Sequence, residues 1–239
     1  MAERFQGKVA LIAGGTGGLG RAVSLAFLQK SARVVVTYRR QAEFAALMRD
    51  AGPASGSLIG CELDATDPDA VRQHIEALAA EHGSIDILVN AIGGYAGGTD
   101  LWSTTPEVWE RMMALNLRSG YSLCRAVAPL MLRQGSGSIV NVASRAAFDH
   151  AAGAAAYAAS KAAAVAMIDS LAADLRGKGV RVNSVIPSII DTGANRQAMP
   201  GADFAKWPKP EDIAKIILFL CSDDARLIHG ASVPVYGDT

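Results

Sequence analysis

The chain has 239 residues, half of them hydrophobic, and its 23 lysines and arginines balance 23 aspartates and glutamates. A length of this order suits one α/β domain with a large core. A formal net charge of +0 gives no general attraction to nucleic acid or to an anionic membrane, so we expect neither as a partner. No uncharged apolar stretch approaches the ~18 residues of a membrane helix. The three cysteines are widely spaced in apolar stretches, which is typical of reduced thiols and favours a cytoplasmic protein.

Short runs rich in valine and isoleucine alternate with helical segments along the chain. We expect seven strands, at residues 9–13, 34–38, 57–61, 86–90, 138–144, 180–187 and 231–236. Three helix starts are marked by prolines, which suit the first helical position: Pro68, Pro106 and Pro210. Nearly all-apolar strands joined by helices predict a parallel sheet covered on both faces. We therefore predict a single doubly wound α/β domain over residues 1–239, with a seven-stranded parallel sheet flanked by helices.

Residues 191–209 are the least regular part of the chain. They contain two prolines, two glycines and Trp207, and they lie between a predicted strand and the last predicted helix. Irregular segments of this kind often cover a binding site. We expect residues 191–209 to form a substrate lid, with Trp207 as a wall of the substrate pocket.

A glycine-rich turn follows the first predicted strand and precedes a helical run that begins at Arg21. Glycines allow a tight turn and a close approach of the backbone to a pyrophosphate, and the helix N-terminus offers N–H groups to its charge. The residues expected to surround such a ligand are Gly14, Thr16, Gly18, Leu19 and Gly20. The turn predicts a dinucleotide site at the start of the chain.

Tyr157 and Lys161 are four residues apart in an alanine-rich helical segment, so both side chains lie on one helix face. A free phenol has a pKa of about 10 and is a poor base at neutral pH. A nearby ammonium favours the ionised phenol, so we expect Lys161 to lower the pKa of Tyr157. Such a pair is most often a plain surface contact, and the surrounding sequence decides between that and an acid/base pair.

That surrounding sequence resembles the classical short-chain dehydrogenase/reductase family, from about Lys8 to Gly237. The turn matches the three glycines of the family's TGxxxGxG loop, with Ala13 in place of the threonine. Ser144, thirteen residues before Tyr157, stands where the family has its catalytic serine, and Asn116 stands where it has its catalytic asparagine. The resemblance implies a Rossmann-like fold and NAD(P)-dependent transfer of a hydride to or from a carbonyl or alcohol carbon.

Residue by residue, the resemblance implies that Tyr157 is the acid/base, Ser144 binds the substrate oxygen, and Asn116 holds a water of the proton relay. It also implies that Lys161, besides tuning Tyr157, binds the nicotinamide ribose. Further cofactor contacts are expected, on the same basis, at Asp64, Asn90, Gly93, Pro187, Ile190 and Thr192. We add His150, in the loop between Ser144 and Tyr157, as a candidate substrate contact. We expect no metal.

The end of the second predicted strand bears on the choice of cofactor. An acid there accepts bonds from free ribose hydroxyls and repels a 2′-phosphate. Tyr38 stands in that place, Arg39 follows, and the next carboxylate is Glu43, so we expect nothing to repel a phosphate. A guanidinium suits bidentate binding of phosphate, which makes NADP(H) the expected cofactor in preference to NAD(H).

Two further expectations concern function class and assembly. A non-catalytic dinucleotide-binding sensor or scaffold is the alternative to an enzyme, because fold alone does not determine function. The four catalytic positions, all occupied, favour the enzyme. The resemblance implies a homo-oligomer, a tetramer or a dimer, which we expect to use the helices around 106–132 and 154–176. The substrate itself, beyond a small carbonyl or alcohol compound, does not follow from the sequence.

Overall fold

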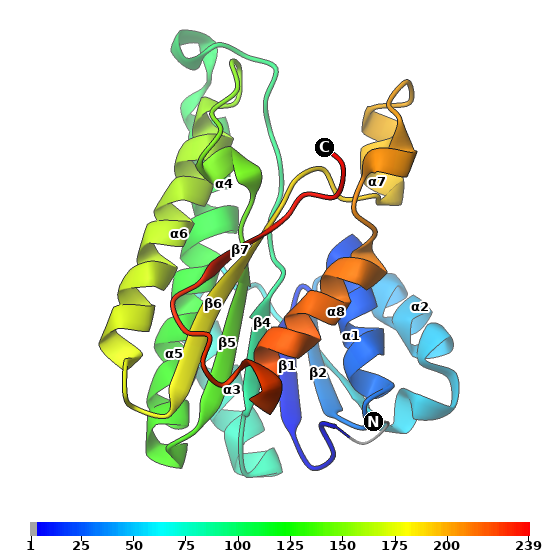
Figure 1. The fold of residues 1–239 in the computed structure, drawn as a ribbon, viewed down its shortest axis with the longest axis vertical. Helices are drawn as coiled ribbons and strands as arrows, with labels where there is room; N and C mark the ends of the chain where they lie inside the picture. Colours follow the sequence, from blue (N-terminus) through cyan, green and yellow to red (C-terminus); the bar gives the residue numbers. More distant parts are fainter. Residues whose placement is uncertain (1–3) are drawn as a thin grey trace.

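The computed structural model describes residues 4–239, so residues 1–3 of the predicted domain lie outside the described part. Seven parallel strands form one sheet in the order β3-β2-β1-β4-β5-β6-β7 (Figure 1). The strands are β1 Val9–Ala13, β2 Arg33–Tyr38, β3 Leu58–Glu62, β4 Ile87–Asn90, β5 Gly137–Val142, β6 Val180–Pro187 and β7 Ser232–Val235. This arrangement confirms the predicted fold class and the place of every predicted strand.

Helices connect the strands and cover both faces of the sheet. They are α1 Gly18–Leu28, α2 Gln41–Ala51, α3 Pro68–His82, α4 Pro106–Met113, α5 Ser119–Gln134, α6 Ala155–Leu175, α7 Gly193–Ala198 and α8 Pro210–Cys221. The three prolines expected at helix starts are the first residues of α3, α4 and α8. A π-helical turn, Ala114–Arg118, joins α4 to α5. No helix in the described part of the chain is long and apolar enough to cross a membrane.

Two apolar layers hold the helices on the sheet. Ile12 and Val36 point to one side, where they pack with residues of α1, α2 and α8 such as Phe27. Leu11 and Val35 point to the other side and pack with α3, α5 and α6. Neighbouring strand residues therefore serve opposite layers, as the two-residue repeat of a strand requires.

The strand order reverses direction next to β1. The chain runs from β1 outward through β2 to β3 and then returns to the other side of β1 as β4. In doubly wound sheets, ligands bind at the carboxyl ends of the strands, where the order reverses. The loops after β1 and β4 open at this point, and the glycine-rich turn is one of them.

Candidate active site

The glycine-rich turn brings the start of α1 very close to the end of β1. Gly14 has a φ of +73°, in the left-handed region, and its N–H donates to the Thr37 hydroxyl at 2.9 Å. A Cβ on Gly20 would lie 2.1 Å from the Gly14 carbonyl oxygen, so only glycine fits there. The N-cap residue Gly17 makes no side-chain cap bond, which leaves the positive end of α1 open to a phosphate. Thr37, which positions this turn, was not predicted from the sequence.

A cavity of about 700 Å³ adjoins the turn. It is lined by six of the predicted cofactor residues: Gly14, Thr16, Tyr38, Arg39, Asp64 and Gly93. Hydrogen bonds from the backbone and side chain of Thr66 hold the pKa of Asp64 below its ordinary value, and the charge of Arg39 adds to this. The carboxylate of Asp64 is therefore charged and turned toward Thr66. The residues expected for the adenosine half of a dinucleotide thus share one hollow.

The lining of this cavity contradicts one prediction about the cofactor. Glu43, in the first turn of α2, lines the cavity beside Arg39 and Arg40. Its carboxylate accepts a hydrogen bond from the Thr16 hydroxyl at 3.2 Å and is ion-paired with Arg40. The prediction that nothing here would repel a phosphate is wrong, because α2 begins directly after β2 and its first turn brings the Glu43 carboxylate to the cavity.

The side chains of two residues predicted to bind the cofactor make contacts within the protein instead. The Leu19 side chain is buried in the core, so only its backbone can face the turn. Asn90 is buried, and its amide nitrogen donates to Asn141 Oδ1 at 3.0 Å, which ties β4 to β5. Its Oδ1 accepts from the Ile92 N–H at 3.3 Å. Asn90 therefore shapes the loop that carries Gly93.

The residues after β6 lie against the glycine-rich turn at the start of α1. A Cβ on Gly18 would lie 2.7 Å from Cγ2 of Thr192, so the start of α1 and Thr192 are in direct contact. Thr192 also caps α7, since its hydroxyl accepts from the Asn195 N–H at 3.2 Å. Pro187, at the end of β6, is buried, and Ile190 packs against the core near it. This segment and the glycine-rich turn therefore form one continuous wall.

Lys161 and Asn116 converge on Gly93. A Cβ on Gly93 would lie 3.0 Å from Lys161 Nζ and 3.2 Å from Asn116 Oδ1, although the two residues belong to α6 and to the π-helical turn. Gly93 also lines the cavity beside the glycine-rich turn. These two candidate catalytic residues and the cavity therefore meet at Gly93, where a side chain would separate them.

Asn116 is held by several hydrogen bonds and is buried. Its Oδ1 accepts from the Gly94 N–H at 2.9 Å, and its Nδ2 donates to the Gly94 carbonyl at 3.1 Å. Nδ2 also lies 3.0 Å from the Ser160 hydroxyl, which itself donates to the Tyr157 carbonyl at 2.7 Å. Ser160 was missed by the sequence reasoning, although it adjoins Lys161. It links the asparagine to the helix that carries Tyr157.

Tyr157 lies between Ser144 and Tyr95. Burial raises the pKa of Tyr157 above its ordinary value, a hydrogen bond with the Ser144 hydroxyl lowers it, and the nearby Tyr95 raises it. The Tyr95 ring meets the Tyr157 ring edge-on at 5.0 Å between centroids. The expected lowering of this pKa by Lys161 is wrong for the structure, because Lys161 is not among the groups that shift it, and burial outweighs the effect of Ser144. Tyr95 was also not predicted.

Lys161 is 5% exposed, and its ammonium donates to the Val142 carbonyl at 3.2 Å. Burial lowers the pKa of Lys161 to about 8. An ammonium carries three N–H donors, so one bond to Val142 leaves capacity for ribose hydroxyls on the side that faces Gly93. The residues present thus fit a dinucleotide cofactor: an uncapped helix start, a cavity beside it, and a buried cation at the inner end.

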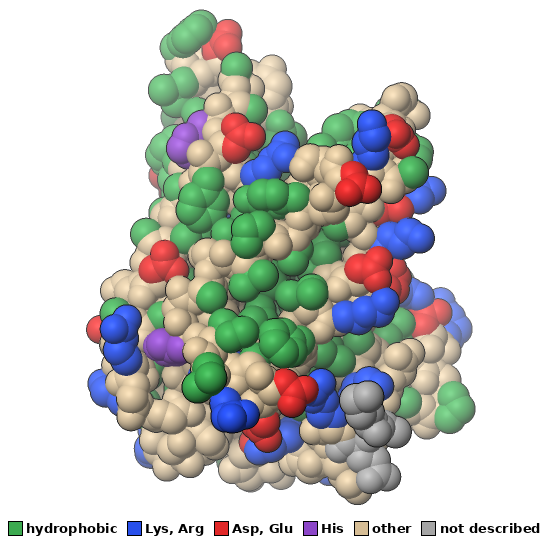
Figure 2. All heavy atoms as spheres, in the orientation of Figure 1, with side chains coloured by type: hydrophobic (Ala, Val, Ile, Leu, Met, Phe, Trp, Pro, Cys, Tyr) green, Lys and Arg blue, Asp and Glu red, His purple; other side chains and the backbone are tan. Residues whose placement is uncertain are grey.

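The expected substrate residues are less closely grouped. His150 is exposed, and Trp207 is 6% exposed with its ring packed on Phe204 at 5.0 Å between centroids. Residues 191–209 fold into α7 and a short turn, Phe204–Lys206. Figure 2 shows a notch between the lobe that carries α7 and the lobe formed by the upper ends of α4 and α6. The notch lies at the carboxyl ends of the strands.

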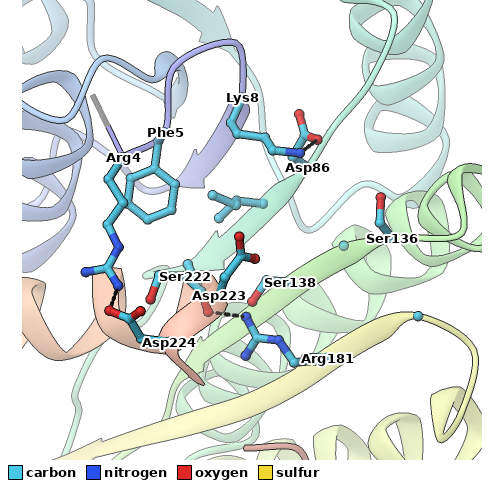
Figure 3. Close-up of a pocket in the computed structure, with 14 residues that line it drawn as sticks. Arg4, Phe5, Lys8, Asp86, Ser136, Ser138, Arg181, Ser222, Asp223 and Asp224 are labelled. Carbon is cyan, nitrogen blue, oxygen red and sulfur yellow. Dashed lines mark hydrogen bonds and ion pairs between the residues drawn. The ribbon is translucent and has the colours of Figure 1, made fainter. Parts of the chain in front are cut away.

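A second hollow, of about 400 Å³, lies at the opposite, amino ends of β4, β5 and β6 (Figure 3). Its charged lining consists of three cations and three carboxylates: Arg4, Lys8, Arg181, Asp86, Asp223 and Asp224. Lys8 pairs with Asp86 at 3.0 Å, and Arg4 pairs with Asp224. Arg181 donates to carbonyl oxygens at the end of α8, including that of Leu220 at 2.6 Å. The three cations are thus engaged by partners within the protein, so we assign this hollow a structural role.

Fold and site together define a doubly wound nucleotide-binding protein with a tyrosine-lysine pair at its switch point. The sequence model described as short chain dehydrogenase matches residues 8–202. Among curated relatives, the 3-oxoacyl-[acyl-carrier-protein] reductase of Thermotoga maritima is 32% identical over 98% of both chains. The D-threitol dehydrogenase of Mycolicibacterium smegmatis is 35% identical over 98% of this chain and 93% of the relative. The chain belongs to the short-chain dehydrogenase/reductase family of oxidoreductases, as predicted.

Solved structures agree with this assignment. A short-chain dehydrogenase/reductase from Burkholderia xenovorans superposes with a TM-score of 0.92, at 34% identity, covering 99% of this chain and 97% of that one. The protein ElxO, solved with NADP bound, superposes with a TM-score of 0.90, at 25% identity, covering 96% and 97% of the two chains.

Proposed function

We propose that this protein is an NAD(P)-dependent enzyme that interconverts a carbonyl compound and an alcohol, with Tyr157 as general acid in reduction and general base in oxidation. The observation that carries the proposal is the convergence of four side chains from three elements. The Ser144 hydroxyl lowers the pKa of the neighbouring Tyr157. Lys161 and Asn116 converge over Gly93. Ser160 connects Asn116 to the backbone of Tyr157. A bound nicotinamide supplies or accepts the hydride.

Each side chain has a defined task in this reaction. Ser144 is placed to donate to the substrate oxygen beside the Tyr157 hydroxyl, which orients the carbonyl toward its proton donor. Lys161, with a pKa of about 8, carries its charge at neutral pH and can hold the ribose hydroxyls through its remaining N–H groups. Asn116, held by Gly94 and Ser160, is positioned to bind a water that exchanges protons with the site.

We further propose that NADP(H) is preferred over NAD(H). Arg39 lines the cavity at the end of β2 and offers a planar guanidinium for a 2′-phosphate. The solved relative ElxO carries NADP, which supports the same choice. The two curated relatives differ in their named substrates, which are a 3-oxoacyl-[acyl-carrier-protein] for one and D-threitol for the other. For this chain we propose a small carbonyl or alcohol substrate, covered by residues 191–209.

Assembly and location complete the proposal. A homo-oligomer is supported by exposed hydrophobic side chains, among them Tyr121 on α5 and Phe219 on α8. Figure 2 shows hydrophobic side chains gathered over the face formed by α8 and β7. The three cysteines form no disulfide, which suits the reducing cytoplasm.

The test is Tyr157→Phe, measured in parallel for turnover and for cofactor binding. The wild-type protein is screened with ketones, acyl thioesters and sugars under both reduced cofactors, and the best pair is used for the variant. We expect kcat to fall by about 100-fold or more, the range of a lost general acid, with cofactor affinity nearly unchanged. Retention of most of the wild-type kcat would remove Tyr157 from its role. Cofactor binding without any turnover in the wild type would favour a dinucleotide-binding sensor instead.

The cofactor preference is tested separately with Arg39→Ala. We expect kcat/KM to fall for NADPH and to stay nearly unchanged for NADH, because only NADPH carries the 2′-phosphate. A wild-type preference for NADH, or an unchanged NADPH efficiency in Arg39→Ala, would contradict the assignment. Lys161→Ala, by contrast, is expected to weaken both cofactors and turnover, since it contacts parts that both share.

A further inference from the structure

Glu43 forms a bridge at the outer end of the nucleotide cavity. One carboxylate oxygen is ion-paired with Arg40 at the N-terminus of α2, and the other accepts from the Thr16 hydroxyl at 3.2 Å. All three residues line the cavity. Arg40 and Glu43 lie near the end of β2, whereas Thr16 lies in the glycine-rich turn. The bridge therefore spans the two segments that would flank the adenosine ribose.

The charges around this bridge are balanced. The cavity lining contains two arginines, Arg39 and Arg40, and two carboxylates, Glu43 and Asp64. Arg40 is already engaged by Glu43, and no ion pair of Arg39 occurs among residues 4–239. A 2′-phosphate brings up to two negative charges and competes with the Glu43 carboxylate for Arg40 and for the Thr16 hydroxyl. Free ribose hydroxyls bring no such charge.

We propose that Glu43 is a cofactor-selectivity residue, whose carboxylate holds Arg40 and Thr16 and thereby limits the preference for a 2′-phosphorylated nucleotide. The inference rests on the proposed binding of NAD(P) and adds a residue to it that acts against Arg39. Arg39 favours binding of the 2′-phosphate. Glu43 keeps Arg40 in an ion pair, so Arg40 interacts less with the phosphate. The protein should therefore discriminate less strongly between NADP(H) and NAD(H) than two arginines at this site would otherwise cause.

The experiment measures binding of two nucleotide fragments, 2′,5′-ADP and 5′-AMP, by titration calorimetry at low salt. The proteins compared are the wild type and Glu43→Gln, which removes the charge and keeps the size of the side chain. The matched control is Glu76→Gln, because Glu76 is an exposed helical carboxylate that also pairs with an arginine, Arg72, but lies on α3 and does not line the cavity. Thermal melting of each variant confirms folding.

In Glu43→Gln we expect the affinity ratio of 2′,5′-ADP to 5′-AMP to rise at least fivefold, and this gain should shrink as salt is added. Adding Arg40→Ala to that variant should cancel most of the gain, since the freed arginine is its source. The control should keep the wild-type ratio. A ratio within twofold of wild type in Glu43→Gln, or a gain that survives Arg40→Ala, overturns the inference. Failure of the wild type to bind NADP⁺ or NAD⁺ would overturn the proposed function instead.

Discussion

The side-chain amide of Asn116 lies 3.0 Å from the hydroxyl of Ser160, which joins the π-helical turn to the helix that carries Tyr157. Ser160 is fully buried and also donates to the Tyr157 carbonyl at 2.7 Å. One hydroxyl therefore links Asn116 to the helix segment that carries the proposed acid/base.

Ser160→Ala removes this link. We expect a loss of about 1–2 kcal/mol in the free energy of unfolding, because a buried donor on Asn116 loses a partner. We also expect kcat to fall more than the affinity for cofactor, because Ser160 holds Asn116, the residue proposed to bind the water of the proton relay. Urea unfolding and steady-state kinetics measure both. Ser170→Ala, on an exposed position of the same helix, is the control and should change neither. Equal effects in the two variants would contradict the positioning role.

Lys161→Met should stabilise the protein below pH 8. Burial lowers the pKa of Lys161 from 10.5 to about 8, so the folded state disfavours its charged form. The penalty is fully present below pH 8, and it is relieved as the pH rises from 8 to 10.5, where the unfolded lysine still binds a proton. The gain in unfolding free energy should be about 1–3 kcal/mol at pH 6–7 and should fade above pH 8. Urea unfolding across this pH range measures it, with the exposed Lys178→Met as control. A gain that is independent of pH would contradict the account.

Tyr95→Phe should move the pH dependence of the oxidative reaction. The nearby Tyr95 contributes to raising the pKa of Tyr157, so removal of its hydroxyl lowers that pKa. Because the base must be ionised in oxidation, the rising limb of kcat/KM should shift to lower pH. The ring contact at 5.0 Å is kept in the variant, so KM should change little. Tyr121→Phe is the control, since Tyr121 is an exposed tyrosine on α5. A shift to higher pH would show that Tyr95 acts on Tyr157 in another way.

We expect a tetramer in solution. A closed tetramer with two-fold axes needs two different self-complementary faces. The first is expected on the helices around 106–132 and 154–176, and the second on α8 and β7, where Phe219 is 39% exposed. Light scattering should give the mass of four chains for the wild type and of two for Phe219→Glu. A monomeric wild type at micromolar concentration would show that neither face is a subunit interface.

The fold could be predicted from the sequence because its strands are short apolar runs bounded by turns. The run predicted at 9–13 is β1 itself, whereas the run predicted at 138–144 ends early, at Val142. Ser144 leaves the strand to cap a short turn, where its hydroxyl accepts from the Ala146 N–H at 3.2 Å. Serine is a preferred cap residue, but Ala143 continues the apolar run after Val142, so the residue types do not mark the end of the strand.

Parts of the site could not be predicted from the sequence, for two physical reasons. Burial decides the pKa of Tyr157, and burial depends on what packs around the phenol and not on its spacing from Lys161. Glu43 and Thr16 are 27 residues apart, and their contact arises only because α2 starts immediately after β2. Motif spacing within one helix is readable from a sequence, whereas contacts between separate loops are not.

The last residues of the described chain lie against residues 191–209. Asp238 donates its N–H to the Lys206 carbonyl at 3.1 Å, and the Thr239 hydroxyl lies 2.6 Å from that of Ser188. Figure 1 shows this end beside α7, near the carboxyl ends of the strands, whereas β1 begins at the opposite end of the molecule. A peptide fused after Thr239 would therefore leave beside residues 191–209, the proposed substrate lid, where it would crowd incoming molecules. A purification tag or an immobilising linker belongs at the other end of this protein.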